Sequence, residues 1–384
     1  MLILAAALSL LIWIYLAAAH GRFWQIKRFT PTPTTATGQA KSIAVIVPAR
    51  NEAEFVGQCI SSLLLQEGGH RIRVFLVDDG SSDGTADVAC QTAEAEGKPE
   101  LLTVLPGKPL AAGWSGKLWA VEQGVESARE LNPDFLLLTD ADIEHGPRSL
   151  ATLITVAESG GFDVASFMVK LYCRSLGERA LIPAFVYFFF QLYPPAWISS
   201  PWRSTAGAAG GSILIRPAAL ERAGGIAAVR NEIIDDCALA RAVKRSGGKV
   251  WLGTTQETKS IRPYGNWKEV GRMISRSAFN QLQHSTWLLL LALAGMTITY
   301  LLPPALTLLG GRSLPALLGA AAWATMAWTF LPIVRFYRLS PLWSLALPLI
   351  AIFYMGTTFH SAFKFWTGKG GEWKGRVQDP SGVG

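Results

Sequence analysis

The chain has 384 residues, of which 50% are hydrophobic and 16% are charged, below the roughly 25% charged share of an ordinary soluble protein. Apolar residues concentrate at 1–19 and 287–359, whereas 40–170 has the composition of a soluble domain. The net charge of +7 includes basic residues beside the apolar segments, such as Arg22 and Arg276. That placement suits anionic lipid head groups, and no nucleic-acid-binding motif is present, so we expect the bilayer as a partner and no nucleic acid.

Residues 1–19 predict an N-terminal transmembrane anchor, because they carry no charge and are just long enough for the ~30 Å hydrocarbon core. A cleavable signal peptide is the alternative, and Ala17–Ala19 resembles a cleavage site. Positive charges follow the apolar run instead of preceding it, which favours the anchor. The same asymmetry places the N-terminus outside and the following domain in the cytoplasm. Residues 20–41 are expected to form a linker.

Three apolar stretches, 287–309, 314–333 and 341–359, predict transmembrane segments within 287–360. Three complete spans put the polar basic tail, 361–384, outside, while its positive charges favour the inside. The number and orientation of these spans are therefore left open.

A fourth apolar run, Leu181–Ile198, interrupts soluble-looking sequence and contains three prolines. We interpret it as a buried or interfacial helix. The alternative is that it lies on the bilayer and helps to admit a lipid acceptor.

From Ser42 onward, short apolar runs alternate with segments of helical spacing. This alternation predicts an α/β fold with a mainly parallel sheet, covered on both faces, in a catalytic domain of 42–286. Ligands in such sheets gather at the carboxyl ends of the strands. The expected strands are 42–49, 73–79, 101–105, 135–142 and 163–169, and the expected helices are 52–66, 85–96, 117–131 and 147–159.

Two adjacent carboxylates, Asp78 and Asp79, follow the second expected strand. The Ser and Gly residues after them are ordinary turn residues, and Asp83 is suited to capping the next helix. Turn formation alone does not account for two neighbouring carboxylates at a strand end.

A second acidic cluster, Asp140 and Asp142, ends the strand expected at 135–142. In an extended chain residues two apart point the same way, so both carboxylates are expected to face one site. Such a pair supplies hard oxygen ligands for Mg²⁺ or Mn²⁺. The alternative is a polar turn that leads into the helix near Pro147.

A third acidic pair, Asp235 and Asp236, starts a segment of helical spacing. Acidic residues stabilise helix N-termini for purely structural reasons, and a general base directed into a cleft would look the same in sequence. The five histidines form no metal-ligand spacing and are interpreted as ordinary polar residues.

Taken in order, these segments resemble the motifs of family 2 glycosyltransferases: P-x-x-N-E, V-D-D-G-S-x-D-x-T, G-K-x-x-A-x-x-x-G, D-x-D, a glycine pair and E-D. The anchor and C-terminal segments make the layout similar to the hopene-associated glycosyltransferases of bacterial hopanoid gene clusters, relatives of ceramide glucosyltransferases. The matching segments are 48–52, 76–85, 116–124, 139–142, 210–211 and 235–236.

Two motifs depart from the family pattern. Asp235 stands where the family has Glu, which is a conservative change. The Q-x-x-R-W element would fall on 273–277, which keeps only Arg276. We interpret this loss as favouring the addition of a single sugar.

The resemblance implies a GT-A-like fold and an inverting, metal-dependent transfer from a UDP-sugar to a membrane lipid, with a hopanoid as the implied acceptor. It also implies a multi-pass protein of the bacterial inner membrane whose catalytic domain faces the cytoplasm. Asp236, with Asp235, is the implied catalytic base, and Asp142 with Asp140 the implied ligands of Mn²⁺ or Mg²⁺. The implied nucleotide-sugar residues are Pro48, Arg50, Glu52, Asp78, Asp79, Lys117 and Asp140; those on the acceptor side are Gly210, Gly211 and Arg276.

Two other functions remain open at this stage. One is a nucleotidyltransferase on a similar sheet, although the segment at 47–52 lacks the glycines of a phosphate loop. The other is a membrane scaffold or flippase-like protein that binds a nucleotide-sugar without catalysis.

Overall fold

A computed structural model describes residues 1–26, 39–367, 372–373 and 376–377. Most of the predicted linker and most of the predicted basic tail lie outside these residues. The chain forms two compact units, here called the sheet unit and the helical unit. The sheet unit consists of Lys27–Tyr172, Trp197–Arg262 and Glu372–Gly384, and the helical unit of Met1–Ile26, Cys173–Ala196 and Pro263–Gly371.

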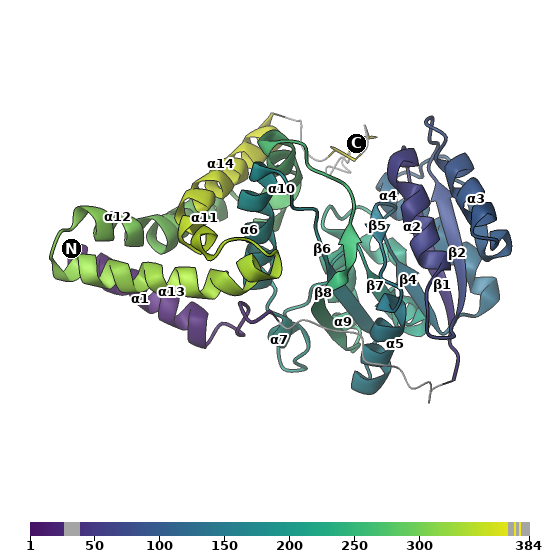
Figure 1. Ribbon diagram of the computed structural model, residues 1–384, viewed down its shortest axis with the longest axis horizontal. Helices are drawn as coiled ribbons and strands as arrows, with labels where there is room; N and C mark the ends of the chain where they lie inside the picture. The colour runs from purple at the N-terminus through teal and green to yellow at the C-terminus, as the bar shows by residue number, and fades with distance from the viewer. Residues whose placement is uncertain (27–38, 368–371, 374–375, 378–384) are drawn as a thin grey trace. The chain divides into compact units, whose positions relative to one another are not determined.

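The sheet unit is built on one mixed sheet, which has eight strands in the described residues, in the order β3-β2-β1-β4-β7-β6-β8-β5 (Figure 1). Strands β3, β2, β1 and β4 are parallel, whereas β7 runs antiparallel to both of its neighbours. The strands are β1 (Ser42–Ala49), β2 (Arg71–Asp78), β3 (Leu102–Pro106), β4 (Phe135–Leu138), β5 (Ile143–Glu144), β6 (Val164–Lys170), β7 (Ile213–Ile215) and β8 (Val250–Ser260).

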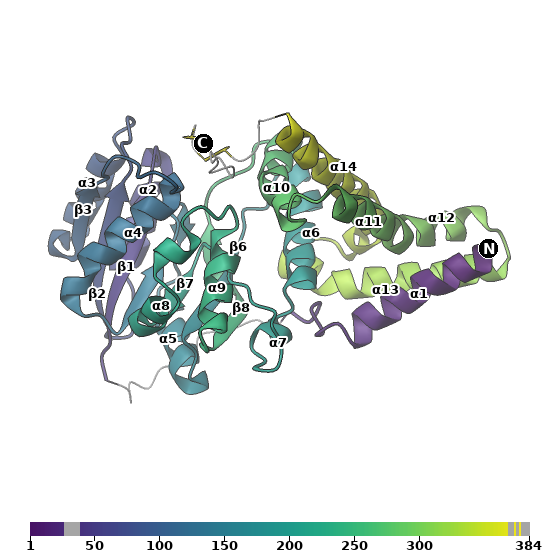
Figure 2. The same cartoon turned by 180° about the vertical axis from the view of Figure 1, so that it is seen from behind.

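Helices cover both faces of this sheet. Helices α2, α3 and α5 pack on one face, where they form the main core with β1, β2 and β4. Figure 2 shows α4, α8 and α9 on the opposite face. The helices are α2 (Ala53–Leu64), α3 (Thr85–Ala95), α4 (Gly116–Ala128), α5 (Ser149–Gly160), α7 (Pro195–Ile198), α8 (Pro217–Arg222) and α9 (Asp235–Arg245), with 3₁₀ turns η1 (Pro99–Leu101), η2 (Arg129–Leu131) and η3 (Ile226–Val229).

The five expected strands and four expected helices are present with ends shifted by a few residues. The sheet is more mixed than expected because the sequence prediction contained neither β7 nor β5, which supply its antiparallel pairs. These strands have three and two residues, too few for hydrophobic periodicity to show.

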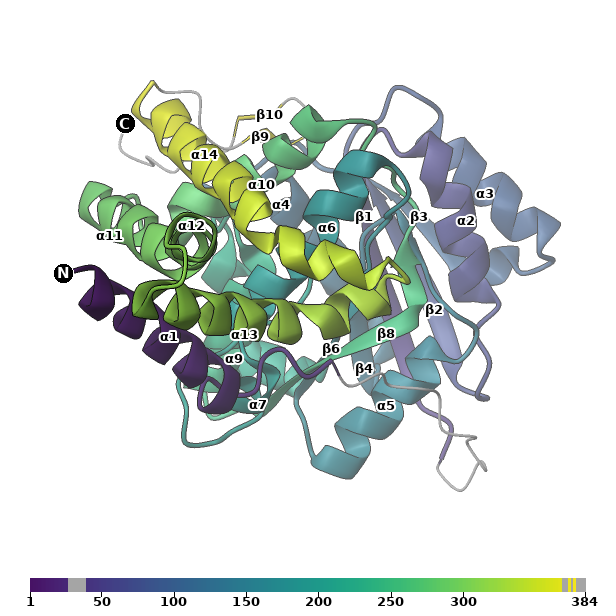
Figure 3. The ribbon, with the colours of Figure 1, turned by 60° about the vertical axis from the view of Figure 1, so that its left-hand side comes forward.

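The helical unit contains the apolar segments predicted from sequence (Figure 3). Helix α1 packs against α13, and α12 packs against α13 as well. The elements are α1 (Leu2–Ala18), α6 (Leu176–Leu192), α10 (Trp267–Gln281), α11 (Thr286–Met296), the π-helical turn η4 (Thr297–Leu301), α12 (Leu302–Leu309), α13 (Leu314–Phe336), the 3₁₀ helix η5 (Pro341–Ala346) and α14 (Leu347–Trp366). A two-stranded pair in the range of the sheet unit joins β9 (Glu372–Trp373) with β10 (Arg376–Val377).

Four helical segments among the described residues are long and apolar enough to cross a membrane. They are Leu176–Ile198, Thr286–Leu309, Leu314–Phe336 and Pro341–Trp366. Helix α1 is shorter, with 17 residues, which corresponds to about 26 Å. Its role as an anchor stays a prediction.

The segment that contains α6 is not a crossing, despite its length and composition. Strands β6 and β7, which precede and follow it in the chain, pair with each other in one sheet. A single crossing between them would place them on opposite sides of the bilayer. Helix α6 is largely buried within the helical unit, where Tyr354 donates to the Leu181 carbonyl at 2.8 Å. These contacts agree with the buried helix expected from the sequence.

Candidate active site

The acidic segment after β4 forms a turn and not the extended chain that we expected. Strand β4 ends at Leu138, and the Ile143 N–H donates back to the Asp140 carbonyl at 3.3 Å. The carboxylates of Asp140 and Asp142 consequently pair with different cations, Lys117 and Arg262. The expectation that both point the same way from an extended strand is wrong, because the strand is too short to include them.

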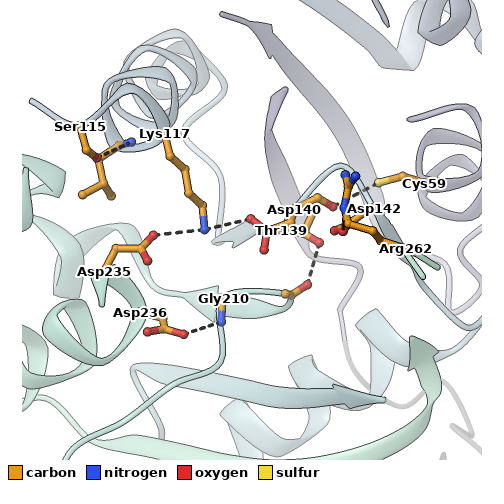
Figure 4. Close-up of polar contacts among 12 residues, drawn as sticks. Cys59, Ser115, Lys117, Thr139, Asp140, Asp142, Gly210, Asp235, Asp236 and Arg262 are labelled. Carbon is orange, nitrogen blue, oxygen red and sulfur yellow. Dashed lines mark hydrogen bonds and ion pairs between the residues drawn. The ribbon is translucent and has the colours of Figure 1, made fainter. Parts of the chain in front are cut away.

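Lys117 joins two of the acidic clusters (Figure 4). Its Nζ lies 2.9 Å from Asp140 and 3.2 Å from Asp235. It occupies the first turn of α4, where the Ser115 side chain caps the helix by accepting from the Leu118 N–H. The cap therefore fixes the position from which the lysine reaches both carboxylates.

The charges of this cluster shift its pKa values. Burial lowers the pKa of Lys117, but Asp140 and Asp235 outweigh it and raise the pKa above that of an ordinary lysine. Burial also raises the pKa of Asp140, against the opposing effect of Lys117. The lysine is thus a fixed positive charge between two carboxylates.

Asp236 is held differently from its neighbour Asp235. Its carboxylate accepts from two backbone N–H groups, that of Gly210 at 2.9 Å and that of Cys237 at 2.7 Å. Burial, and then the charge of Asp235, raise its pKa to about 6, against the opposing effects of Lys117 and of the two N–H groups. A carboxylate with such a pKa is suited to accept a proton near neutral pH.

Asp236 and Lys117 line a pocket together with Asp140, Asp235 and Gly210. A Cβ on Gly210 would lie 3.5 Å from the Lys117 Nζ and 3.6 Å from the Asp236 carboxylate. The glycine therefore keeps open the space between the lysine and the aspartate. Pro48, predicted on the nucleotide side, lines the same pocket.

Arg262 is a site residue that the sequence did not reveal. It follows β8, pairs with Glu52 and lies 2.7 Å from Asp142 through its Nε, while its guanidinium stacks on the Phe55 ring at 4.5 Å. A basic residue after an unpredicted polar strand gives no sequence signal by itself. The arginine brings together Glu52 and Asp142, which the sequence placed on the nucleotide and metal sides.

The two carboxylates after β2 have different surroundings. Asp78 accepts from the Ser81 N–H at 3.0 Å and from the Ser81 hydroxyl, so it stabilises its own turn. Asp79 is buried and lies 3.6 Å from Arg50, which also donates to the Asp79 backbone carbonyl. Asp83 accepts from the Thr85 N–H at the start of α3, although Gly84 and not Asp83 occupies the N-cap position. The Arg50–Asp79 pair is therefore the stronger candidate for nucleotide recognition.

A buried histidine, interpreted from sequence as ordinary, lies beside the acidic turn. The side chain of His145 is within hydrogen-bonding distance of the Thr139 hydroxyl, at 2.9 Å. Burial lowers the pKa of His145 to about 4, so the ring is neutral at pH 7.

A metal bound at this site would have few protein ligands. Within the part of the chain that the structure describes, no group of three or more His, Cys, Asp or Glu residues could hold an ion. Mg²⁺ is often bound by one or two carboxylates together with substrate phosphates. The contacts with Lys117 and Arg262 each use one oxygen of Asp140 and Asp142, so this donor set fits a divalent ion that arrives with a diphosphate.

The structure brings most predicted site residues into the sheet unit, in two connected groups. Lys117 links the first group, Asp140 and Asp235 with Asp236 beside them, and Arg262 links Glu52 and Asp142. Arg276 belongs to the helical unit, where it is exposed on α10. Its acceptor role stays a prediction.

The sequence profile of Glycosyl transferase family 2 matches residues 44–237. This range begins within β1, includes β2 to β7 and ends in the first turn of α9. It also includes Lys117, Asp140, Asp142 and Asp236. The match supports a transferase of sugars over a nucleotidyltransferase or a non-catalytic membrane protein.

Similar proteins were found by sequence and by structure. The undecaprenyl-phosphate 4-deoxy-4-formamido-L-arabinose transferase of Pseudomonas savastanoi pv. phaseolicola is 27% identical over 126 residues, 32% of this chain and 34% of that protein. The protein of the same name from Pseudomonas syringae pv. syringae is 26% identical over 126 residues. The chain thus matches about a third of the length of these relatives.

A solved structure extends the likeness to nearly the whole chain. The mannosyltransferase PcManGT from Pyrobaculum calidifontis, in complex with GDP-Man and Mn²⁺, has a TM-score of 0.54 and 20% identity, covering 94% of this chain and 99% of that one. At this identity the likeness establishes the fold, a GT-A-like α/β fold with a mixed sheet.

Proposed function

The chain belongs to glycosyl transferase family 2, and we propose that it moves a single sugar from a UDP-sugar to a hydroxyl group of a membrane lipid, with inversion at the anomeric carbon. The observation that carries this proposal is the placement of Asp236. Its carboxylate lines the pocket with Lys117 and is held by the Gly210 N–H. A carboxylate held in this way can take the proton from an acceptor hydroxyl as the oxygen attacks the sugar.

The remaining residues of the site serve the donor. Lys117 supplies a point charge for the diphosphate, and the pair of buried Asp79 with partly buried Arg50 presents polar groups for the nucleobase. Asp142 and Asp140 would hold Mg²⁺ or Mn²⁺. The bound ion would neutralise negative charge on the departing nucleoside diphosphate. One displacement inverts the anomeric carbon, so no covalent glycosyl-enzyme is needed.

The proposed acceptor class rests on the proposed role of Asp236 as a general base. A hydroxyl group has to lose its proton during the attack, whereas a phosphate monoester is already anionic at neutral pH. The raised pKa of Asp236, about 6, therefore favours a hydroxyl-bearing lipid, and the hopene-associated resemblance suggests a hopanoid polyol. A polyprenyl phosphate is the second candidate, since the two Pseudomonas relatives are named for undecaprenyl phosphate.

We further propose that the enzyme resides in the bacterial inner membrane with its sheet unit in the cytoplasm. The apolar helices of the helical unit support a membrane location. Basic residues such as Arg22, which follows α1, and Arg335, at the end of α13, support the orientation.

The test is donor consumption by the purified protein in detergent. Nucleotide-sugars are offered with Mn²⁺ or Mg²⁺ and, in separate reactions, a hopanoid polyol, a polyprenyl phosphate or a membrane lipid extract. We expect metal-dependent release of nucleoside diphosphate, with labelled sugar in the hydroxyl-lipid fraction. Label in the polyprenyl phosphate alone would select the second candidate, and no release with any donor and acceptor would contradict the proposed function.

A further inference from the structure

A hydrogen-bonded path joins the acidic turn to residues 208–212, here called the glycine loop because they contain Gly210 and Gly211. The Thr139 hydroxyl donates to the Gly211 carbonyl at 2.8 Å, and the His145 Nε2 lies 2.9 Å from the same hydroxyl. A hydroxyl has one hydrogen to donate, and here it goes to Gly211. The contact with His145 is therefore one in which the histidine Nε2–H donates to the threonine oxygen.

The glycine loop at the end of this path also contacts the base. The Gly210 N–H donates to Asp236 at 2.9 Å, one residue before the carbonyl that Thr139 holds. A Cβ on Gly211 would lie 2.9 Å from Val169, so the loop is closely packed at this point. The contact between Thr139 and the Gly211 carbonyl therefore restrains the segment that carries the Gly210 N–H.

We propose that His145 is a positioning residue for the catalytic base. By donating to Thr139 it directs the threonine hydroxyl at the Gly211 carbonyl, and the glycine loop then keeps the Gly210 N–H on Asp236. This inference rests on the proposed function, in which Asp236 takes the acceptor proton. His145 and Thr139 themselves transfer no proton to or from the substrate.

The contribution of His145 is local, because the glycine loop has another tether. The Ala209 N–H donates to the Ser166 hydroxyl at 2.9 Å. The Ala209 carbonyl also accepts from the Ser212 N–H at 3.1 Å. Loss of the histidine contact therefore leaves the loop attached to β6 and shifts the segment around Gly210 without releasing it. We expect misaligned catalysis and not an unfolded sheet unit.

Two variants of His145, to asparagine and to glutamine, distinguish the loss of its hydrogen bond from the loss of its packing contacts. The amide nitrogen of glutamine reaches about as far as the histidine Nε2, whereas that of asparagine is one bond shorter. We expect His145→Asn to lower kcat about tenfold, the effect of losing one buried hydrogen bond, with the donor KM unchanged. His145→Gln should keep kcat within about twofold of the natural protein. Thr139→Val should resemble His145→Asn, and Thr139→Ser should resemble the natural protein.

A second measurement does not depend on sugar transfer. Hydrogen exchange, followed by mass spectrometry in the detergent-solubilised full chain, reports on the backbone N–H groups of 208–212. We expect exchange to accelerate in this segment in His145→Asn and to remain slow in His145→Gln, with the other strands of the sheet unit unchanged.

The outcomes separate the two proposals. Equal kcat values for the asparagine and glutamine variants, unchanged exchange in 208–212, or faster exchange throughout the sheet unit would each overturn the positioning role. If the natural protein transfers no sugar at all, the proposed function fails, and the exchange measurement still decides whether His145 orders the glycine loop.

Discussion

At the scale of single residues, two carboxylates stand side by side at the start of α9 and differ in their partners. Asp235 forms an ion pair with Lys117, whereas the contacts of Asp236 are with the backbone N–H groups of Gly210 and Cys237. The ion pair occupies the carboxylate of Asp235, which is why we propose Asp236 as the base.

Asp236→Asn keeps the shape of the side chain and removes its ability to accept a proton. We expect kcat for a hydroxyl-bearing lipid to fall at least about 100-fold, the lower range for general base catalysis, with donor binding unchanged. The measurement is steady-state transfer together with nucleotide affinity. Asp235→Asn is the matched control and should lower kcat by a smaller factor. Near-normal turnover in Asp236→Asn would refute the assignment of the base.

The rate of transfer should depend on pH through the same residue. The pKa of Asp236 is raised to about 6 by burial and by Asp235, and Lys117 opposes this rise. The base must be unprotonated, so activity should be present above this pH and be lost as the pH falls through it. Lys117→Met removes the opposing charge and should move the acid limb of kcat/KM upward, whereas Lys117→Arg should leave it in place. An acid limb that stays fixed in Lys117→Met would show that another group titrates.

At the scale of elements, α1 supplies hydrogen-bond donors to a broken helix. Pro303 and Pro304 carry no backbone N–H, so carbonyls of the preceding turn, η4, lose their helical donors. The Trp13 Nε1 donates to the Thr299 carbonyl at 2.7 Å, and the Ser9 hydroxyl donates to the Ile298 carbonyl at 2.9 Å. Such substitutes matter most in hydrocarbon, where no water can take their place. Helix α1 is therefore a structural part of the helical unit.

Trp13→Phe retains an aromatic ring and removes the donor to Thr299. We expect the variant to be destabilised by about 1–3 kcal/mol, the cost of an unsatisfied buried carbonyl, and so to melt at a lower temperature in detergent. Tyr15→Phe, on the exposed side of the same helix, is the control and should melt normally. Equal melting temperatures for all three proteins would mean that another group satisfies the carbonyl.

Elements with a strong hydrophobic pattern were predictable from sequence, and those defined by tertiary contacts were not. Strand β1 is buried along nearly its whole length and was correctly predicted. Strand β8 is longer but contains Gly253 and several polar residues, so its pattern is weak, and Arg262 after it was missed for that reason. Lys117 was found through its motif, whereas the role of His145 depends on a loop 66 residues away in sequence, which no local pattern encodes.

At the scale of the whole molecule, the number of crossings after the sheet unit depends on α14. The second half of α14 lies along α10, as shown by the hydrogen bond from the Phe279 N–H to Ser361, at 3.1 Å, and by the Phe279 and Trp366 rings, 5.8 Å apart. Helix α10 exposes a basic stripe, Lys268, Arg272 and Arg276, spaced at four-residue intervals. Each of these charges would cost about 2.5–3.5 kcal/mol at the bilayer centre. We therefore propose that the half of α14 beside α10 lies at the membrane surface.

The first half of this segment is too short to cross alone. Residues 341–352 would span about 18 Å as an α-helix, against a hydrocarbon core of ~30 Å. In this proposal two crossings remain after the sheet unit, α11 to α12 and α13. With an even number of crossings, the basic tail is on the same side of the membrane as the sheet unit. This placement agrees with the positive charges of the tail, which three spans would put on the outside.

This topology predicts which cysteines a membrane-impermeant maleimide reaches in sealed, oriented vesicles. The exposed natural Cys90 marks the side of the sheet unit. In a Cys90→Ser background, Ser381→Cys in the tail should be labelled from the side that reaches Cys90 in the natural protein. Arg312→Cys, between α12 and α13, should be labelled only from the opposite side. Labelling of Ser381→Cys and Arg312→Cys from one common side would mean that α14 crosses the bilayer after all, because α13 and α14 would then carry the chain across twice between the two positions.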